Sequence, residues 1–182
     1  IGAEGQFIMG AIFSGALGLA FYPHESTILF PLMIIFGILG GILWAAIPAV
    51  LRTYFNTNEI LVSLMLVYVA EQVLAAASIG FLRNPDGAGF PGSRNLSQYP
   101  SAANLEIFSG TGIHWGVAAA LISVIFFYII LYKHKFGFQV SLSGMSPKAA
   151  RLSGINPRLL VICCLALSGG LAGLAGMFEL TG

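Results

Sequence analysis

Five long apolar runs are the feature that most restricts how this chain can fold. The clearest of them, residues 113–132, contains no Asp, Glu, Lys or Arg. A helix needs about 20 apolar residues to cross the hydrocarbon core of a bilayer. Because every backbone polar group must be hydrogen-bonded in lipid, apolar runs of this length favour helices. The sequence therefore predicts an all-α fold, a polytopic transmembrane helix bundle.

The whole chain, 1–182, is expected to form a single transmembrane domain. Only 8% of its residues are charged, whereas soluble domains carry about 25%. The pattern predicts membrane spans at 6–21, 27–50, 60–82, 113–132 and 158–178, a loop at 83–112, and a basic segment at 133–157.

The first run, 6–21, is short for a full span. Either earlier residues complete it, or the helix begins inside the membrane. The polar and glycine residues Gly2, Glu4, Gly5 and Gln6 favour the second reading, because a break at membrane depth is tolerated only against protein or a water-filled cavity. Glu4 and Gln6 are therefore candidate residues of a polar path.

Two further polar residues, Glu71 and Gln72, lie near the middle of 60–82. Glu71 is about 18 Å along the helix axis from Glu59. A carboxylate facing lipid at that depth costs several kcal/mol, so Glu71 is expected to face the bundle interior or a watered cavity. It could contact a polar substrate, or it could make a structural hydrogen bond to another helix.

Small residues recur along three of the runs and predict close helix packing. They are Gly10, Ser14 and Gly18 in the first run, Gly37 and Gly41 in the second, and Gly169, Gly173 and Gly176 in the last. Trp44 is expected to anchor its helix at a membrane interface, and the alternative is that it lines a cavity.

The most polar and basic part of the chain, 144–157, has the signals of a short surface helix. Ser146 can cap it, and Pro147 suits its first position. Gly154 can end it and Pro157 prevents its continuation. Two interpretations remain open: a basic loop that only sets topology, or a docking helix for a partner protein.

The distribution of basic residues orients the chain in the membrane. If the loops alternate between the two sides, one side holds six Lys and Arg residues and the other holds Arg83 and Arg94. The positive-inside rule places the first side in the cytoplasm. The six are Arg52, Lys133, Lys135, Lys148, Arg151 and Arg158.

Residues 144–155, GMSPKAARLSGI, resemble the pattern G-x-N-P-x-A-A-R-x-x-G-I of inner-membrane permease subunits of ABC importers, in the branch that serves simple sugars and nucleosides. Three more stretches agree in order and spacing: IGAEGQ at 1–6, NEILVSLMLVY at 58–68 and SGGLAGLAG at 168–176. The likeness runs from end to end. It departs at Val67, where the family often has Asn. Family members are about twice as long, so the chain is expected to be an internal piece of a permease.

The resemblance implies a function, a place and a set of partners. It implies a permease in the bacterial inner membrane that works with a cytoplasmic ABC ATPase subunit, a second permease subunit (homo- or heterodimer) and a periplasmic or lipid-anchored substrate-binding protein. The basic helix would be the coupling helix, seated in a groove of the ATPase. The residues it assigns to that contact are Ser146, Pro147, Lys148, Ala149, Ala150, Arg151 and Gly154.

No sequence signature of an enzyme is present. The chain lacks G-x-x-x-x-G-K-[ST], H-E-x-x-H and G-x-S-x-G, and Cys163 and Cys164 are adjacent, without the spacing of a metal site. Catalytic residues, cofactors and metals are therefore not expected, and a net charge of +1 gives no general attraction for nucleic acid. Alternative functions are an ion-coupled secondary transporter or channel, and a structural membrane scaffold.

Overall fold

A computed structural model describes residues 2–22, 24, 27–84, 96, 100–104, 106–108 and 113–182. The helices are α1 (Ala3–Ala20), α2 (Leu29–Phe55), α3 (Glu59–Ile79), α4 (Trp115–Tyr132), α5 (Lys135–Met145), α6 (Pro147–Leu152) and α7 (Pro157–Thr181). Five of them, α1 to α4 and α7, are long and apolar enough to cross a membrane. The expected all-α helix bundle is confirmed, with one small antiparallel pair of strands, β1 (Glu106–Phe108) and β2 (Ile113–His114).

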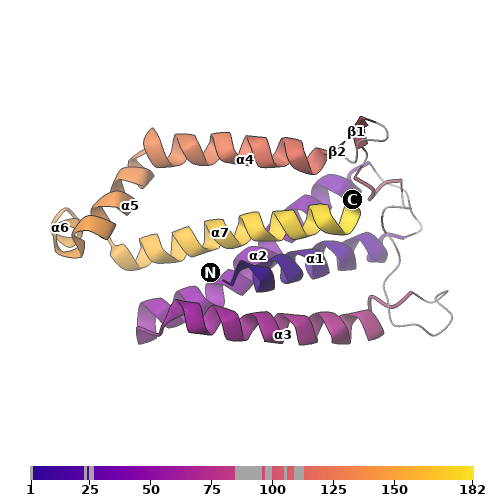
Figure 1. Cartoon of the computed structure of the whole chain (residues 1–182), viewed down its shortest axis with the longest axis horizontal. Helices are drawn as coiled ribbons and strands as arrows, with labels where there is room; N and C mark the ends of the chain where they lie inside the picture. Colours follow the sequence, from indigo (N-terminus) through magenta and orange to yellow (C-terminus); the bar gives the residue numbers. More distant parts are fainter. Residues whose placement is uncertain are drawn as a thin grey trace.

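The long helices lie side by side, and α2 crosses α7 and α1 obliquely (Figure 1). α5 and α6 form an arm at one end of the bundle, and β1 and β2 lie at the other end. α4 runs beside α7, and none of its residues is buried. The tightly packed part of the molecule is therefore made by α1, α2, α3 and α7.

Glycines hold α7 against α1 and α2, as their spacing predicts. A Cβ atom placed on Gly173 would collide with the backbone of Gly37 and Gly41 in α2. A Cβ on Gly10 of α1 would in turn collide with the backbone of Gly173. Any side chain at these positions would force the helices apart, so their close contact depends on glycine.

α1 begins at Ala3, three residues before the expected start, and the stretch expected to break the helix is part of it. Gly2 lies in the left-handed region (φ 59°) and marks the start. A Cβ on Gly2 would lie 2.6 Å from the Cβ of Ser63, one turn inside α3. The N-terminus therefore lies part-way along the bundle, as Figure 1 also shows.

α2 continues to Phe55, whereas its span was expected to end at residue 50. Asn56 ends it in the left-handed conformation (φ 50°), which Asn adopts more easily than most residues. Asn58 then caps α3, its Oδ1 accepting a hydrogen bond from the Ile60 N–H at 3.0 Å. Asn is one of the favoured cap residues, so the sequence itself favours this cap.

Trp44 is not an interfacial anchor. It lies near the middle of α2 and packs against the buried cluster around Met9, Ile12 and Ala70. The indole nitrogen would lie 2.9 Å from a Cβ on Gly5 of α1. The small residue opposite makes room for the indole, so Trp44 fills the helix interface instead of reaching the membrane surface.

The segment 83–112 is described only in part, so the prediction of an outer loop there lies largely outside the described residues. Leu96 and Ala102 are buried against Leu29, Met33 and Met177 at the end of the bundle. Asn104 joins two helices, because its backbone N–H donates to the Thr181 carbonyl (2.9 Å) and its Oδ1 accepts from the Trp115 N–H (3.1 Å).

Candidate docking helix and acidic membrane face

α6 has the capping that the sequence predicts. The Ser146 Oγ accepts a hydrogen bond from the Ala149 N–H (3.3 Å), and Pro147 occupies the first turn. At the other end Gly154 is left-handed (φ 77°), and the Ile155 N–H donates to the Ala150 carbonyl (3.0 Å). Both ends of this two-turn helix are therefore fixed by local hydrogen bonds.

Ser146 also ends α5, since its backbone N–H donates to the Leu142 carbonyl (2.9 Å). One residue thus terminates α5 and starts α6, with no linker between them. The start of α5 is capped by His134, whose Nδ1 accepts from the Phe136 N–H (3.2 Å). The arm formed by α5 and α6 is accordingly a stiff bent element.

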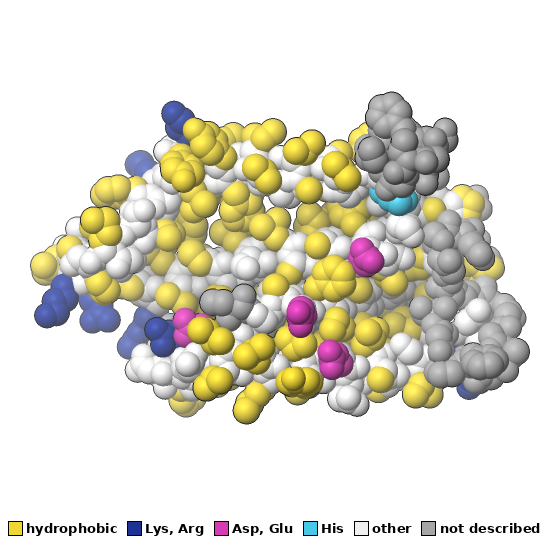
Figure 2. Space-filling view, viewed as in Figure 1, with side chains coloured by type: hydrophobic (Ala, Val, Ile, Leu, Met, Phe, Trp, Pro, Cys, Tyr) yellow, Lys and Arg dark blue, Asp and Glu magenta, His cyan; other side chains and the backbone are white. Residues whose placement is uncertain are grey.

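The tip of the arm combines basic and apolar surface. Lys148 and Arg151 are exposed, Met145 is 86% exposed and Leu152 is 91% exposed, while Ala150 is buried. Lys and Arg gather at this end of the molecule in Figure 2. Large apolar side chains fully exposed beside cations are typical of a protein interaction surface. The tip is at the end of the molecule that carries the basic residues, which the sequence predicts to be the cytoplasmic end.

The residues predicted for partner contact therefore lie together in one capped helix. They are Ser146, Pro147, Lys148, Ala149, Ala150, Arg151 and Gly154. The sequence prediction did not include Met145, the last residue of α5, or Leu152, the last residue of α6. Their extreme exposure could not be read from a sequence in which most residues are apolar.

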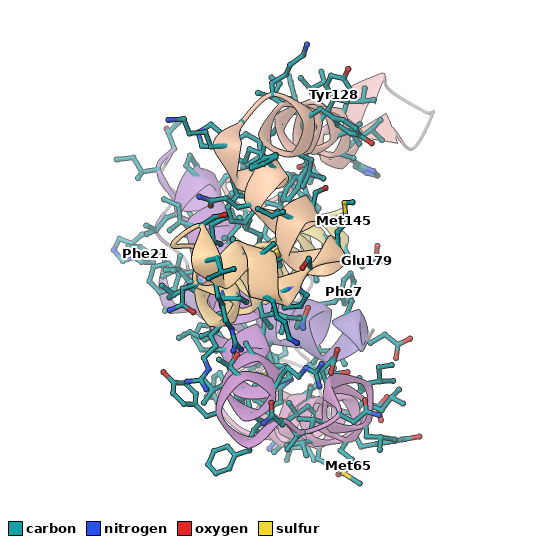
Figure 3. All side chains as sticks on the ribbon, turned by 90° about the vertical axis from the view of Figure 1, so that its left-hand side faces the viewer. Phe7, Phe21, Met65, Tyr128, Met145 and Glu179 are labelled. Carbon is teal, nitrogen blue, oxygen red and sulfur yellow. The ribbon has the colours of Figure 1, made fainter. Side chains whose placement is uncertain are left out.

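A second feature is a face of the bundle that carries carboxylates, which we call the acidic face. It consists of Glu4 on α1, Glu71 on α3 and Glu179 on α7, all exposed. Figure 2 shows acidic side chains on the side where α7, α1 and α3 run next to one another, surrounded by apolar surface. Figure 3 places Glu179 on the same side as Phe7 of α1, opposite Phe21. Three membrane helices thus present carboxylates in one direction.

The four predicted path residues do not form one group. Glu4 and Glu71 belong to the acidic face, and Gln72 is exposed next to Glu71. Gln6 is only 4% exposed and instead lines a cavity of about 340 Å³ near the Arg52–Glu59 ion pair. Glu179 was not among the predicted path residues, because its place just after an apolar run indicates either the exit from the membrane or a polar break in the helix.

Arg52 and Glu59 form an ion pair (Nε–Oε2 3.3 Å) between the end of α2 and the start of α3. Glu59 also lies in the first turn of α3, where a negative charge suits the helix dipole. Both side chains are partly exposed, so the pair contributes at most about 1 kcal/mol. Its main effect is to fix the turn between the two helices.

Other chemistry is sparse in the part of the chain that the structure describes. No group of three or more His, Cys, Asp or Glu residues there could hold a metal ion. Cys163 is exposed and Cys164 half-buried, and both are free thiols.

Comparison with known proteins gives a consistent result. The model of a family described as branched-chain amino acid transport system / permease component matches residues 1–182. The chain is 30% identical to the glucose ABC transporter permease protein TsgB13 of Haloferax volcanii, over all of this chain and 50% of that protein. It is 28% identical to the guanosine ABC transporter permease protein NupP of Bacillus subtilis, over 98% of this chain and 51% of that protein.

A third relative is the nucleoside ABC transporter permease protein NupB of Lactococcus lactis, 26% identical over 97% of this chain and 50% of that protein. The chain thus spans about half the length of these curated relatives. No solved structure matches it significantly.

Proposed function

The chain belongs to the family described as branched-chain amino acid transport system / permease component, and from this premise we propose that it forms part of the permease subunit of an ABC importer. The substrate class is a simple sugar or a nucleoside, since relatives matching over the whole chain are named for glucose, guanosine and nucleosides. The chain is a multi-pass membrane protein, and we place it in the bacterial inner membrane.

The observation that carries this proposal is the tip of the arm. The capped helix α6, with exposed Lys148, Arg151 and Leu152, stands at the basic end of the bundle. Met145, the last residue of α5, is exposed next to it. A six-residue helix with one buried residue cannot be stable through its own packing, so a partner that seats it explains both its capping and its exposure. We assign that partner as the cytoplasmic ABC ATPase subunit, which supplies the energy for transport.

The acidic face supports the transport part of the proposal. Carboxylates facing lipid at depth are costly, so Glu4, Glu71 and Glu179 require either water or protein in front of them. A path between this face and a second permease subunit provides both. Carboxylate oxygens accept hydrogen bonds from hydroxyl groups, which suits a neutral, hydroxyl-rich substrate.

The proposed mechanism follows from the positions of these two features. A substrate-binding protein, periplasmic or lipid-anchored, delivers substrate at the end of the bundle that carries β1 and β2. Closure of the ATPase pair on ATP moves α6. Because Ser146 ends α5 and starts α6 with no linker between them, α5 moves together with α6. The attached membrane helices then tilt and open the path to the cytoplasm.

The test is reconstitution of the full-length permease in proteoliposomes with its ATPase and binding protein. Uptake of radiolabelled D-glucose, D-ribose and uridine is measured with ATP, with ADP, and under a proton or sodium gradient without ATP. We expect uptake of at least one probe with ATP alone. Uptake driven by an ion gradient in the absence of the ATPase would instead support a secondary transporter, for which the carboxylates of the acidic face would be ion ligands.

A further inference from the structure

The cavity that Gln6 lines lies where the arm meets the bundle. Its polar wall is built by Gln6 of α1, the Arg52–Glu59 pair of α2 and α3, Ser63 of α3 and Ser143 of α5. The remainder of the wall is apolar and comes from α2, α5 and α7. The volume of about 340 Å³ is within the range of small-molecule sites. The cavity lies toward the end of the bundle that we assign to the cytoplasm.

Two atoms of this wall are buried without a hydrogen-bond partner among the described residues. They are the Oε1 atom of Gln6, a side chain only 4% exposed, and the Oγ atom of Ser143. Leaving such groups unpaired costs free energy, because both are fully hydrogen-bonded in water. They come from helices far apart in the sequence, and both line the same cavity.

The wall also defines the chemistry of an occupant. Gln6 Oε1 accepts hydrogen bonds, and Ser143 Oγ both donates and accepts. The Arg52 and Glu59 charges neutralise each other at 3.3 Å, so the wall offers no net charge to an ion. The apolar part of the wall suits the C–H face of a ring. This combination fits a neutral molecule with several hydroxyl groups.

We propose that this cavity, which we call the inner cavity, is a binding site for a neutral polyhydroxylated solute at the cytoplasmic end of the path, bounded on one side by the arm. The inference rests on the proposed function, whose substrate class has this chemistry. Ser143 is three residues before Ser146, where α5 passes directly into α6. When α6 moves with the ATPase, it therefore moves one wall of the site. Closure of the ATPase pair on ATP is in this way linked to release of the solute.

Cys164 provides a native reporter, because it lines the inner cavity whereas Cys163 does not. The experiment uses the full-length permease with its partner subunits in proteoliposomes. N-ethylmaleimide modification of each thiol is followed by peptide mass spectrometry, with and without D-glucose, D-ribose or uridine. A probe that is transported should slow modification of Cys164 about tenfold when present at ten times its Kd, without slowing that of Cys163.

Two variants test the polar contacts. Gln6→Leu and Ser143→Ala should each raise the probe concentration for half-protection by about 2–10-fold. The matched control is Ser78→Ala, since the Ser78 hydroxyl already donates to the Leu74 carbonyl (2.8 Å) outside the cavity. Gln6→Leu should leave the Tm without probe unchanged or higher, whereas a purely structural glutamine would lower it.

If none of the probes protects Cys164 from modification, the inner cavity holds only water and the proposal is overturned. Protection that is equal in the wild type and both variants would overturn it too. ATP-driven uptake without protection would reject the inner cavity and leave the importer intact. Protection without ATP-driven uptake would reject the importer and leave a solute site.

Discussion

Arg151 occupies the position in α6 where the resemblance expects a partner contact, and the structure leaves its guanidinium exposed beside Leu152. A cation next to an exposed apolar side chain can pair with a carboxylate and still bury apolar area. Lys148, one turn earlier, is exposed in the same helix. These side chains are therefore where a charge reversal should act on binding rather than on folding.

Arg151→Glu should weaken association with the ATPase at least about 30-fold, because breaking a buried interfacial charge pair costs about 2 kcal/mol or more. Association is measured by titrating labelled ATPase into the full-length permease in nanodiscs. Lys133→Glu is the control, since Lys133 is exposed at the same end of the bundle but outside α6. Equal affinity in both variants would contradict the docking role.

Glu71 tests the acidic face. Glu71→Leu should lower ATP-driven uptake by about tenfold or more, because a hydrogen bond to a charged group contributes about 1.5–3 kcal/mol. Glu71→Gln, which keeps an acceptor oxygen, should retain more activity. Assembly, measured by size-exclusion chromatography, should stay normal in both. If Glu71 faced lipid, Glu71→Leu would leave uptake unchanged and raise stability.

Single residues show where sequence reasoning succeeds and where it stops. The caps Ser146 and Asn58 could be predicted because a cap is determined by residues two or three positions apart. Trp44 could not, because its surroundings depend on Gly5 of α1, which meets α2 only in the folded bundle. Glu179 joins the acidic face for a similar reason, since no local pattern relates α7 to α1 and α3.

Among the helices, α7 has the most specific packing. Gly169, Gly173 and Gly176 meet the backbones of α2 and α1 at distances that no Cβ atom tolerates. Spacing alone predicted that these stripes pack, but not which helices they meet. Partner choice is set by the whole bundle, because every glycine stripe in the chain offers a similar surface.

Gly173→Leu should separate α7 from α1 and α2 and lower the thermal stability of the full-length permease in detergent. Overpacking and the loss of close contacts each cost on the order of 1–3 kcal/mol. The Tm is measured by fluorescence-detected size-exclusion after heating. The control is Gly144→Ala, where an added Cβ has no neighbour within 4 Å and helix propensity improves. A normal Tm for Gly173→Leu would contradict the contact.

For the whole molecule, the separation of charge predicts the orientation. Lys and Arg side chains gather at the end formed by the arm (Figure 2). The elements at this end carry Arg52, Lys133, Lys135, Lys148, Arg151 and Arg158, whereas Arg83 follows the opposite end of α3 (Figure 1). This prediction needs only the charges in the sequence, because the rule depends on loop composition rather than on packing. The acidic face, in contrast, required the arrangement of the helices.

Single cysteines placed in a background with Cys163 and Cys164 replaced by Ser test this orientation. Arg83→Cys should react with a membrane-impermeant maleimide in intact cells, and Lys148→Cys should react only after the membrane is permeabilised. Both positions are exposed, so neither signal is limited by burial. The reverse labelling pattern would place the arm outside and overturn the proposed function.

α4 connects directly to the arm yet has no buried residue. Interlocked side chains of the described residues therefore do not hold α4 in place. A helix with so few fixed contacts can change its tilt at a small cost in free energy, on the microsecond-to-millisecond timescale of collective motions. In the proposed mechanism α4 therefore tilts with the arm, while α1, α2 and α7, which pack through glycines, keep their arrangement.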